Sequence, residues 1–225
     1  MHMDIQELGS VQLWENGPYW AECNVGATKP EEYGYYFCWG DTVAYTRSGG
    51  TLDNCGDYND VTWVSSKGEQ MTNSPFTPSA CPTCEKDNSA LLSAGYIDST
   101  GNLVSKYDAA TAHLGSPWRM PTCSELQDLI NNCTTTWTTK NGVYGRLVTG
   151  KGAYSDESIF LPAAGFGIDS VLLGAGSSGY YWFSTPYSDD SFFAWKLDFD
   201  SGDFDENCYS RFCGQSVRPL REFAK

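Results

Sequence analysis

An acidic hairpin is the most unusual chemical feature of this sequence. Residues 198–213 read DFDSGDFDENCYSRFC and combine four aspartates with four aromatic residues and two cysteines. A two-residue loop at Ser201-Gly202 would pair the residues on either side of it, counted outward from the loop. Because side chains alternate along a strand, the aspartates are then predicted to share one face while Leu197 and the phenylalanines turn toward the core. The aspartates are Asp198, Asp200, Asp203 and Asp205.

Three interpretations of this acidic face remain open. Exposed carboxylates tolerate one another in water and salt, so the face could simply be solvated. Clustered carboxylates also bind calcium, but DFDSGDFDEN lacks the regular ligand spacing of an EF-hand loop. Since like charges placed opposite one another destabilise a sheet, the face could instead be a binding surface that was not selected for stability. We expect water to relieve the repulsion in the free protein, and Lys or Arg groups of a ligand to relieve it in a complex.

The cysteines do not define a metal or catalytic site. There are nine of them, so at least one is unpaired or pairs with another molecule. The CPTC segment at Cys81 and Cys84 has the spacing of half a zinc site, but no second CxxC exists and His113 is the only imidazole besides His2. We favour a loop disulfide or two plain thiols there. No GxSxG elbow or other catalytic constellation is present, so we predict no enzyme activity, no metal and no cofactor.

Charge and hydropathy exclude two classes of partner. The net charge of −14 is unsuited to nucleic acid, because no Lys/Arg cluster is available to displace counterions from phosphates. No apolar run approaches the length of a bilayer span, so no direct membrane insertion is expected. Met1-His2-Met3 has the residue order of a trimmed start, from which a leader or lipid anchor would have been removed.

The rest of the chain, which must position the hairpin, is predicted to form a β-rich α+β domain. Residues 11–41 and the chain after Trp137 consist of short aromatic and β-branched runs separated by turn residues. Two helices are predicted, at 104–114 and at 122–133, the second because Thr122 and Glu125 form a capping box. Residues 42–102 are rich in Ser, Thr, Asn, Gly and Pro and are predicted to be a long, irregular surface insertion. The later strand-like runs are GVYGRLVTG, SIFLPAAGF, GYYWFSTP, FFAWKLDFD and QSVRPL.

A family resemblance rests on four motifs in a specific order. WRMPT begins at Trp118, FLPAAG at Phe160, YWFSTP at Tyr181 and GQSVRP at Gly214. Together with their surroundings these segments resemble the Fibrobacter succinogenes major paralogous domain family over more than half the chain. The resemblance implies a single domain over 1–225 with a C-type lectin-like fold, related to formylglycine-generating enzymes.

The chain also resembles the variable proteins of diversity-generating retroelements, in which adenine-directed mutagenesis rewrites a segment just before a GQSVRP-like end. Randomising both adenines of an Asn codon never yields Lys, Glu or Trp, so Trp195, Lys196 and Glu206 would be fixed positions. The resemblance implies a variable ligand-binding surface at 187–213 whose partner is a protein or glycan on another cell. The predicted ligand-binding residues are Asp189, Asp190, Phe192, Phe193, Asp198, Asp200, Asp203, Asp205, Asn207, Cys208, Ser210, Phe212 and Cys213.

Location and two alternative functions follow from the same resemblance. It implies an extracellular or cell-surface protein, including a trimmed lipoprotein, or a component of a phage virion tail. Cys208 and Cys213 have a spacing similar to the copper-binding pair of formylglycine-generating enzymes, which makes a copper oxidase one alternative. A structural adhesin subunit without a variable surface is the other, because fold does not decide function.

Overall fold

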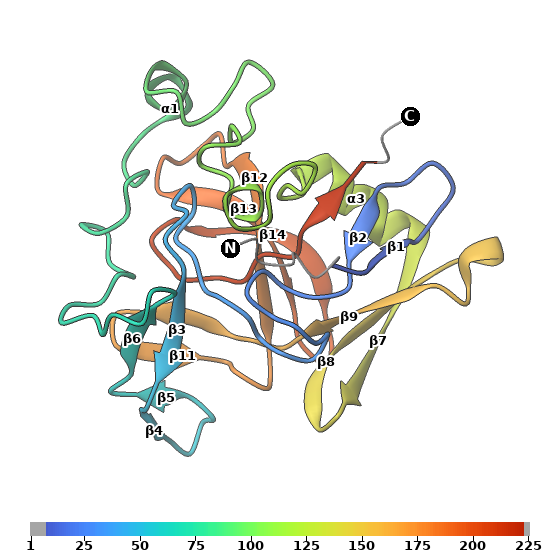
Figure 1. Ribbon diagram of the computed structural model, residues 1–225, viewed down its shortest axis with the longest axis horizontal. Coiled ribbons are helices and arrows are strands. Elements are labelled where there is room, and N and C mark those ends of the chain that lie inside the picture. Colours follow the sequence, from blue (N-terminus) through green and yellow to red (C-terminus); the bar gives the residue numbers. More distant parts are fainter. Residues whose placement is uncertain (1–7, 223–225) are drawn as a thin grey trace, which may run out of the picture.

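The structure is a computed structural model that describes residues 8–222, so the Met1-His2-Met3 start lies outside the described residues (Figure 1). The chain is 12% helical and 37% strand. Its strands form small antiparallel sheets, as expected for a β-rich α+β protein. None of the helices in the described part is long and apolar enough to cross a membrane.

Five sheets occur within residues 8–222. In sheet order they are β1 (Ser10–Gln12), β2 (Tyr19–Ala21) and β15 (Leu220–Arg221); β10 (Phe166–Ile168), β11 (Val171–Leu173), β5 (Tyr58–Asn59) and β4 (Thr51–Leu52); β12 (Gly179–Pro186), β13 (Phe193–Phe199) and β14 (Phe204–Ser210); β3 (Tyr45–Ser48) and β6 (Thr62–Ser65); and β7 (Cys133–Lys140), β8 (Val143–Gly150) and β9 (Ser158–Pro162).

The two ends of the described chain meet in one sheet. β2 lies between β1 and β15, with Trp20 opposite both Val11 and Leu220. Figure 1 shows the C-terminal strand beside this N-terminal pair. Val11 and Leu220, from opposite ends of the chain, thus lie close together on either side of Trp20. Most of the predicted QSVRPL strand instead runs as extended chain, and only its last residue lies in β15.

The helices are α1 (Asn88–Ser93), α2 (Ala109–Leu114) and α3 (Cys123–Asn132). The capping box of Thr122 and Glu125 starts α3 as predicted. The helix predicted at 104–114 begins later, because Asp108 caps α2 by accepting a hydrogen bond from the Thr111 amide at 2.9 Å. α1 was not predicted, since six residues are too few to show a helical period.

The segment 42–102 is more than a surface insertion, and the prediction was wrong on this point. It contains β3 to β6 and α1. Trp63 and Phe76 are 1% and 0% exposed and pack edge to face with their ring centroids 4.6 Å apart. Figure 1 shows β3 to β6 gathered with β11 at one end of the molecule. Aromatic anchors from this segment therefore complete a core with residues from the second half of the chain, including Leu172.

Apolar side chains of the FLPAAG, YWFSTP and GQSVRP motifs lie in the core. Phe160, Leu161, Trp182 and Val217 are all buried. Trp118 is only partly buried, and its ring centroid lies 5.2 Å from the guanidinium of Arg221. Cys133 is buried and is the first residue of β7, so the helix predicted at 122–133 ends one residue earlier.

Candidate functional site

The acidic hairpin has the predicted register. β13 and β14 pair antiparallel, with Phe199 opposite Phe204 and Asp198 opposite Asp205. β12 pairs with the other edge of β13. Gly179 in β12 lies under the Phe199 ring, where a Cβ atom would come within 2.2 Å of the ring. A glycine is therefore required there for the phenylalanine to pack flat on the sheet.

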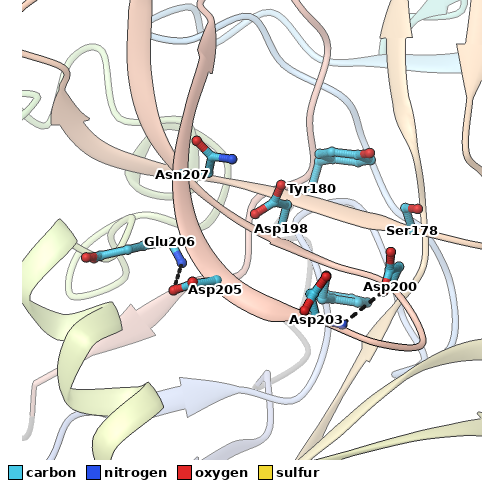
Figure 2. A pocket seen from close by; sticks show the side chains of 9 residues that line it. Ser178, Tyr180, Asp198, Asp200, Asp203, Asp205, Glu206 and Asn207 are labelled. Carbon is cyan, nitrogen blue, oxygen red and sulfur yellow. Dashed lines mark hydrogen bonds between the residues drawn. The ribbon is translucent and has the colours of Figure 1, made fainter.

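The two faces of this sheet differ as the alternation predicted. Leu197 and Phe199 are each 3% exposed and belong to a core cluster that also contains residues of α3. The four aspartates of the hairpin lie on the other face and border an open pocket of about 400 Å³ (Figure 2). Its lining residues are Ser178, Tyr180, Asp198, Phe199, Asp200, Asp203, Asp205, Glu206 and Asn207. We call these residues the acidic pocket.

A buried lysine, and not water alone, relieves the charge on this face. The Lys196 Nζ atom lies 2.7 Å from Asp198 Oδ2, and the lysine side chain is 1% exposed. Its ammonium group also lies 4.9 Å and 5.6 Å from the ring centroids of Tyr180 and Tyr209. Burial lowers the pKa of Lys196, and the bond to Asp198 acts in the opposite direction. The expectation of relief by water is thus wrong for Asp198, because the chain supplies its own cation.

A second cationic side chain stabilises the hairpin loop by hydrogen bonds to its backbone. Arg146, in β8, donates from Nε to the Asp200 carbonyl at 2.9 Å and from Nη2 to the Asp203 carbonyl at 3.1 Å. The Asp200 carboxylate accepts hydrogen bonds from the amides of Gly202 at 2.6 Å and Asp203 at 3.0 Å. These backbone bonds, with a contribution from Arg146, lower the pKa of Asp200. Asp200 therefore shapes the loop, while Asp203 and Asp205 keep their carboxylates at the exposed rim.

The residues at 8–222 form neither a metal-binding cluster nor a disulfide. No group of three or more His, Cys, Asp or Glu side chains within residues 8–222 is placed to hold a metal ion. All nine cysteines fall in this range, and none forms a disulfide. Of the two alternatives left open for Cys81 and Cys84, a loop disulfide or two plain thiols, the structure has the two thiols.

The predicted residues before β13 lie away from the acidic pocket. Asp189, Asp190 and Phe192 belong to the loop between β12 and β13, and Phe193 is the first residue of β13. The hairpin loop follows the other end of β13, which at about 3.4 Å per residue is roughly 20 Å away along the strand. Phe192 is 38% exposed and is a large apolar side chain available to a partner. The predicted surface thus divides into the acidic pocket and a separate loop at 187–192.

The predicted residues after Asn207 are mostly turned away from the pocket. Cys208 is opposite Trp195 in the hairpin, on the face that carries Leu197, and Ser210 is opposite Phe193. Phe212 packs partly against a core cluster. Cys213 is 0% exposed, so its prediction as a ligand contact was wrong. Of the thirteen predicted residues, those in the pocket are Asp198, Asp200, Asp203, Asp205 and Asn207.

The two cysteines of the copper alternative differ in accessibility. Cys208 is half-buried, whereas Cys213 is 0% exposed. Burial together with the neighbouring Cys81 raises the pKa of Cys213 to about 12. A copper ion would have to enter the core to reach Cys213 and displace its proton.

Several contributors to the site were not predicted from the sequence. Lys196 is two residues before Asp198 on the same strand and four before Asp200, so its side chain points to the same face. The alternation of side chains could therefore have placed Lys196 on the acidic face. Tyr180 and Ser178 come from β12 and the residue before it, and Arg146 comes from β8. No local pattern indicates that these segments meet the hairpin. Figure 2 shows Tyr180 beside Asp198, and Glu206 directed toward a helix, where it accepts a hydrogen bond from Gln127 Nε2 at 3.1 Å.

Comparisons with known proteins add no relative: no protein-family model, curated protein or solved structure matches the chain.

Proposed function

We propose that the protein is a receptor- or adhesin-type ligand-binding protein that recognises a protein or glycan on another cell surface. The observation that carries this proposal is the acidic pocket, an open concavity whose rim carries the exposed carboxylates of Asp203 and Asp205. Lys196 balances the charge of Asp198, but no ion pair within residues 8–222 balances Asp203 or Asp205, which lies opposite Asp198. Exposed carboxylates without an ion-pair partner in the fold favour selection for binding.

The chemistry of the pocket suggests the kind of ligand group it takes. Asp203 and Asp205 are exposed, so they can pair with Lys or Arg side chains of a protein ligand. Ser178, Tyr180 and Asn207 add neutral donors and acceptors of the type that sugar hydroxyls bind. The hairpin is rigid because Arg146 and the Asp200 carboxylate fasten its loop. A preorganised surface lowers the entropy that is lost on binding.

We also propose that residues 187–213 are diversified by a retroelement, on a protein displayed at the cell surface or on a phage tail. The three positions that this mechanism leaves fixed have structural contacts. Lys196 is buried, Trp195 packs against the core, and Glu206 contacts Gln127 and lies 3.6 Å from the Cys123 sulfur. The side chains of Asp203, Asp205 and Asn207 are exposed and can change at little cost to the fold.

Binding of a cationic probe tests the acidic pocket. An arginine-rich peptide is expected to bind the wild-type protein, and its association should slow as salt rises, since exposed charges are screened beyond about 10 Å at 0.1 M salt. The Asp203→Asn/Asp205→Asn variant should bind more weakly. A matched variant, Asp60→Asn/Asp156→Asn, removes the same charge at exposed positions outside the pocket and should bind like wild type. Equal weakening in both variants would mean that net charge, and not the pocket, attracts the peptide.

The flanking DNA tests diversification independently of binding. We expect a reverse-transcriptase gene near the coding sequence, and an adenine-rich near-copy of the segment that encodes residues 187–213. Sequencing this locus in sibling isolates should show substitutions confined to codons whose template copy contains adenine. A locus with neither feature would contradict the retroelement proposal and leave the binding proposal standing.

A further inference from the structure

The Cys81-Pro82-Thr83-Cys84 turn lies apart from the acidic pocket and has its own chemistry. Cys81 and Cys84 are 7% and 8% exposed and belong to the same core cluster as Cys38. The Cys81 sulfur lies 3.4 Å from the Thr83 hydroxyl oxygen. Thr83 is fully buried and donates from the same hydroxyl to the Trp39 carbonyl at 2.6 Å. Two cysteines are therefore held on one short, buried turn.

A buried guanidinium group backs this turn. Arg211 is 0% exposed and donates from Nη1 to the carbonyls of Thr83 at 3.0 Å and Lys86 at 2.7 Å. Its guanidinium lies 4.9 Å from the ring centroid of Trp39. Its Nη2 atom is buried and has no hydrogen-bond partner. None of the ion pairs found in the described residues involves Arg211, so only the charge of Asp190, beyond ion-pair distance, and the two thiols act on its guanidinium.

Such a site favours an anion, and the anion that the chain itself can supply is a thiolate. The neighbouring Cys38 and Cys84 side chains lower the pKa of Cys81 well below its ordinary value. The interaction with Cys81, together with burial, raises the pKa of Cys38 and of Cys84. Burial lowers the pKa of Arg211 to about 10, while Cys81 and Cys84 act in the opposite direction. At neutral pH one thiolate, on Cys81, is thus supported by two neighbouring thiols and a guanidinium ion.

We propose that Cys81 and Cys84 form a redox-active dithiol that small-molecule disulfides such as oxidised glutathione convert to an intramolecular disulfide. The Cys81 thiolate attacks one sulfur of the oxidant, forms a mixed disulfide and releases one glutathione thiolate. Cys84 then loses its proton and attacks the Cys81 sulfur, which releases the second glutathione. Starting from the Cys81 thiolate and the Cys84 thiol, the pair loses one proton and two electrons, and the oxidant is reduced to one glutathione thiolate and one glutathione thiol. Both residues are only slightly exposed, so the first step requires the turn to open enough for the oxidant to reach Cys81.

This dithiol is independent of the proposed ligand recognition, because neither cysteine lines the acidic pocket. Cys84 is chosen as the second thiol over Cys38 because it is only three residues from Cys81 and shares its turn. Cys38 is more deeply buried, at 3% exposure, and its sulfur lies 3.3 Å from the Phe212 carbonyl and 3.4 Å from the Pro75 carbonyl. Those contacts fix the Cys38 side chain against the backbone and leave Cys84 as the second thiol.

Oxidation of the full chain tests the proposal. The reduced protein is treated with oxidised glutathione, and intact mass and peptide mapping locate each modification. Wild type should lose two hydrogen atoms in the peptide that contains Cys81 and Cys84. Cys84→Ser should instead retain one glutathione on Cys81, and Cys38→Ser should still form the Cys81–Cys84 disulfide. Cys55 is exposed and serves as an internal control for the activity of the oxidant.

Three outcomes would overturn the proposal. The first is a Cys38–Cys81 disulfide in wild type, the second is glutathione on Cys55 with the turn left unmodified, and the third is stoichiometric zinc bound to the purified protein through these thiols. The pH dependence of alkylation is a second readout. The rate at which iodoacetamide labels Cys81 in the folded Cys84→Ser variant should change little between pH 5 and pH 8. In the denatured chain, where the thiol has its ordinary pKa, the labelling rate of the same residue should rise roughly tenfold for each unit of pH increase over this range. A tenfold rise per unit in the folded chain as well would also overturn the assignment.

Discussion

Replacing Trp182 with alanine is expected to lower the free energy of unfolding by about 3–5 kcal/mol. Trp182 is 0% exposed and packs in the core cluster that contains Phe37 and Val217. Its indole Nε1 donates to the Phe37 carbonyl at 2.8 Å. The substitution leaves a cavity, and the Phe37 carbonyl keeps only the hydrogen bond from the Gln215 amide at 3.0 Å. Chemical denaturation with a fluorescence or circular-dichroism readout measures the loss.

Two other substitutions serve as controls for Trp182→Ala. Trp137→Ala removes the same side chain from a half-exposed position where the ring stacks on Tyr144, so the loss should be clearly smaller. Asp203→Ala changes the rim of the acidic pocket and should alter stability by less than about 1 kcal/mol. If Asp203→Ala destabilised the protein as much as Trp182→Ala, the acidic rim would be part of the folding core and could not serve as a tolerant binding surface.

Replacing Arg218 with methionine should be equally severe, at roughly 4 kcal/mol or more, because each buried acceptor left without a donor costs about 1–3 kcal/mol. Arg218 is 2% exposed and joins three segments of the chain. It donates to Asn24 Oδ1 at 2.9 Å, to the carbonyls of Ala21 at 3.0 Å and Glu22 at 2.9 Å, and to the Phe160 carbonyl at 2.9 Å. Methionine has a similar length but no donor, so thermal and denaturant unfolding should both report the loss.

Arg221→Met provides the matched control for Arg218. Arg221 is only half-buried, donates to the Ser10 hydroxyl at 3.1 Å and lies over the ring of Trp118. Its removal should cost well under half as much, since water can replace the lost donor. A small effect at Arg218 would show that water reaches the carbonyls of Ala21 and Phe160, contrary to the burial described above.

Local sequence patterns specified the hairpin well, for a physical reason. The two-residue loop and the strict alternation of acidic and apolar residues determine which side chains face each other, and both are properties of neighbouring residues. The capping box at Thr122 is equally local and was confirmed together with α3. The composition of the short strands likewise indicated a β-rich α+β protein before any contact was known.

The errors arose where distant segments meet. Segment 42–102 has the composition of a loop, yet Trp63 and Phe76 in it complete a core with residues more than ninety positions away, such as Leu172. Cys213 belongs to the same acidic and aromatic stretch as the pocket residues and is nevertheless buried. Composition reports how much apolar surface a segment offers, but not which partner covers it.

For the candidate site, the sequence by itself determined the four aspartates, their common face and the register of their hairpin, because alternation and turn geometry act between neighbouring residues. Only the tertiary structure decided how that charge is balanced and where the surface ends. Arg146 reaches the hairpin loop from β8, Tyr180 reaches Lys196 from β12, and the loop at 187–192 lies at the far end of β13. Contacts of this kind depend on how separate strands are arranged in space, and no local spacing in the sequence records that arrangement.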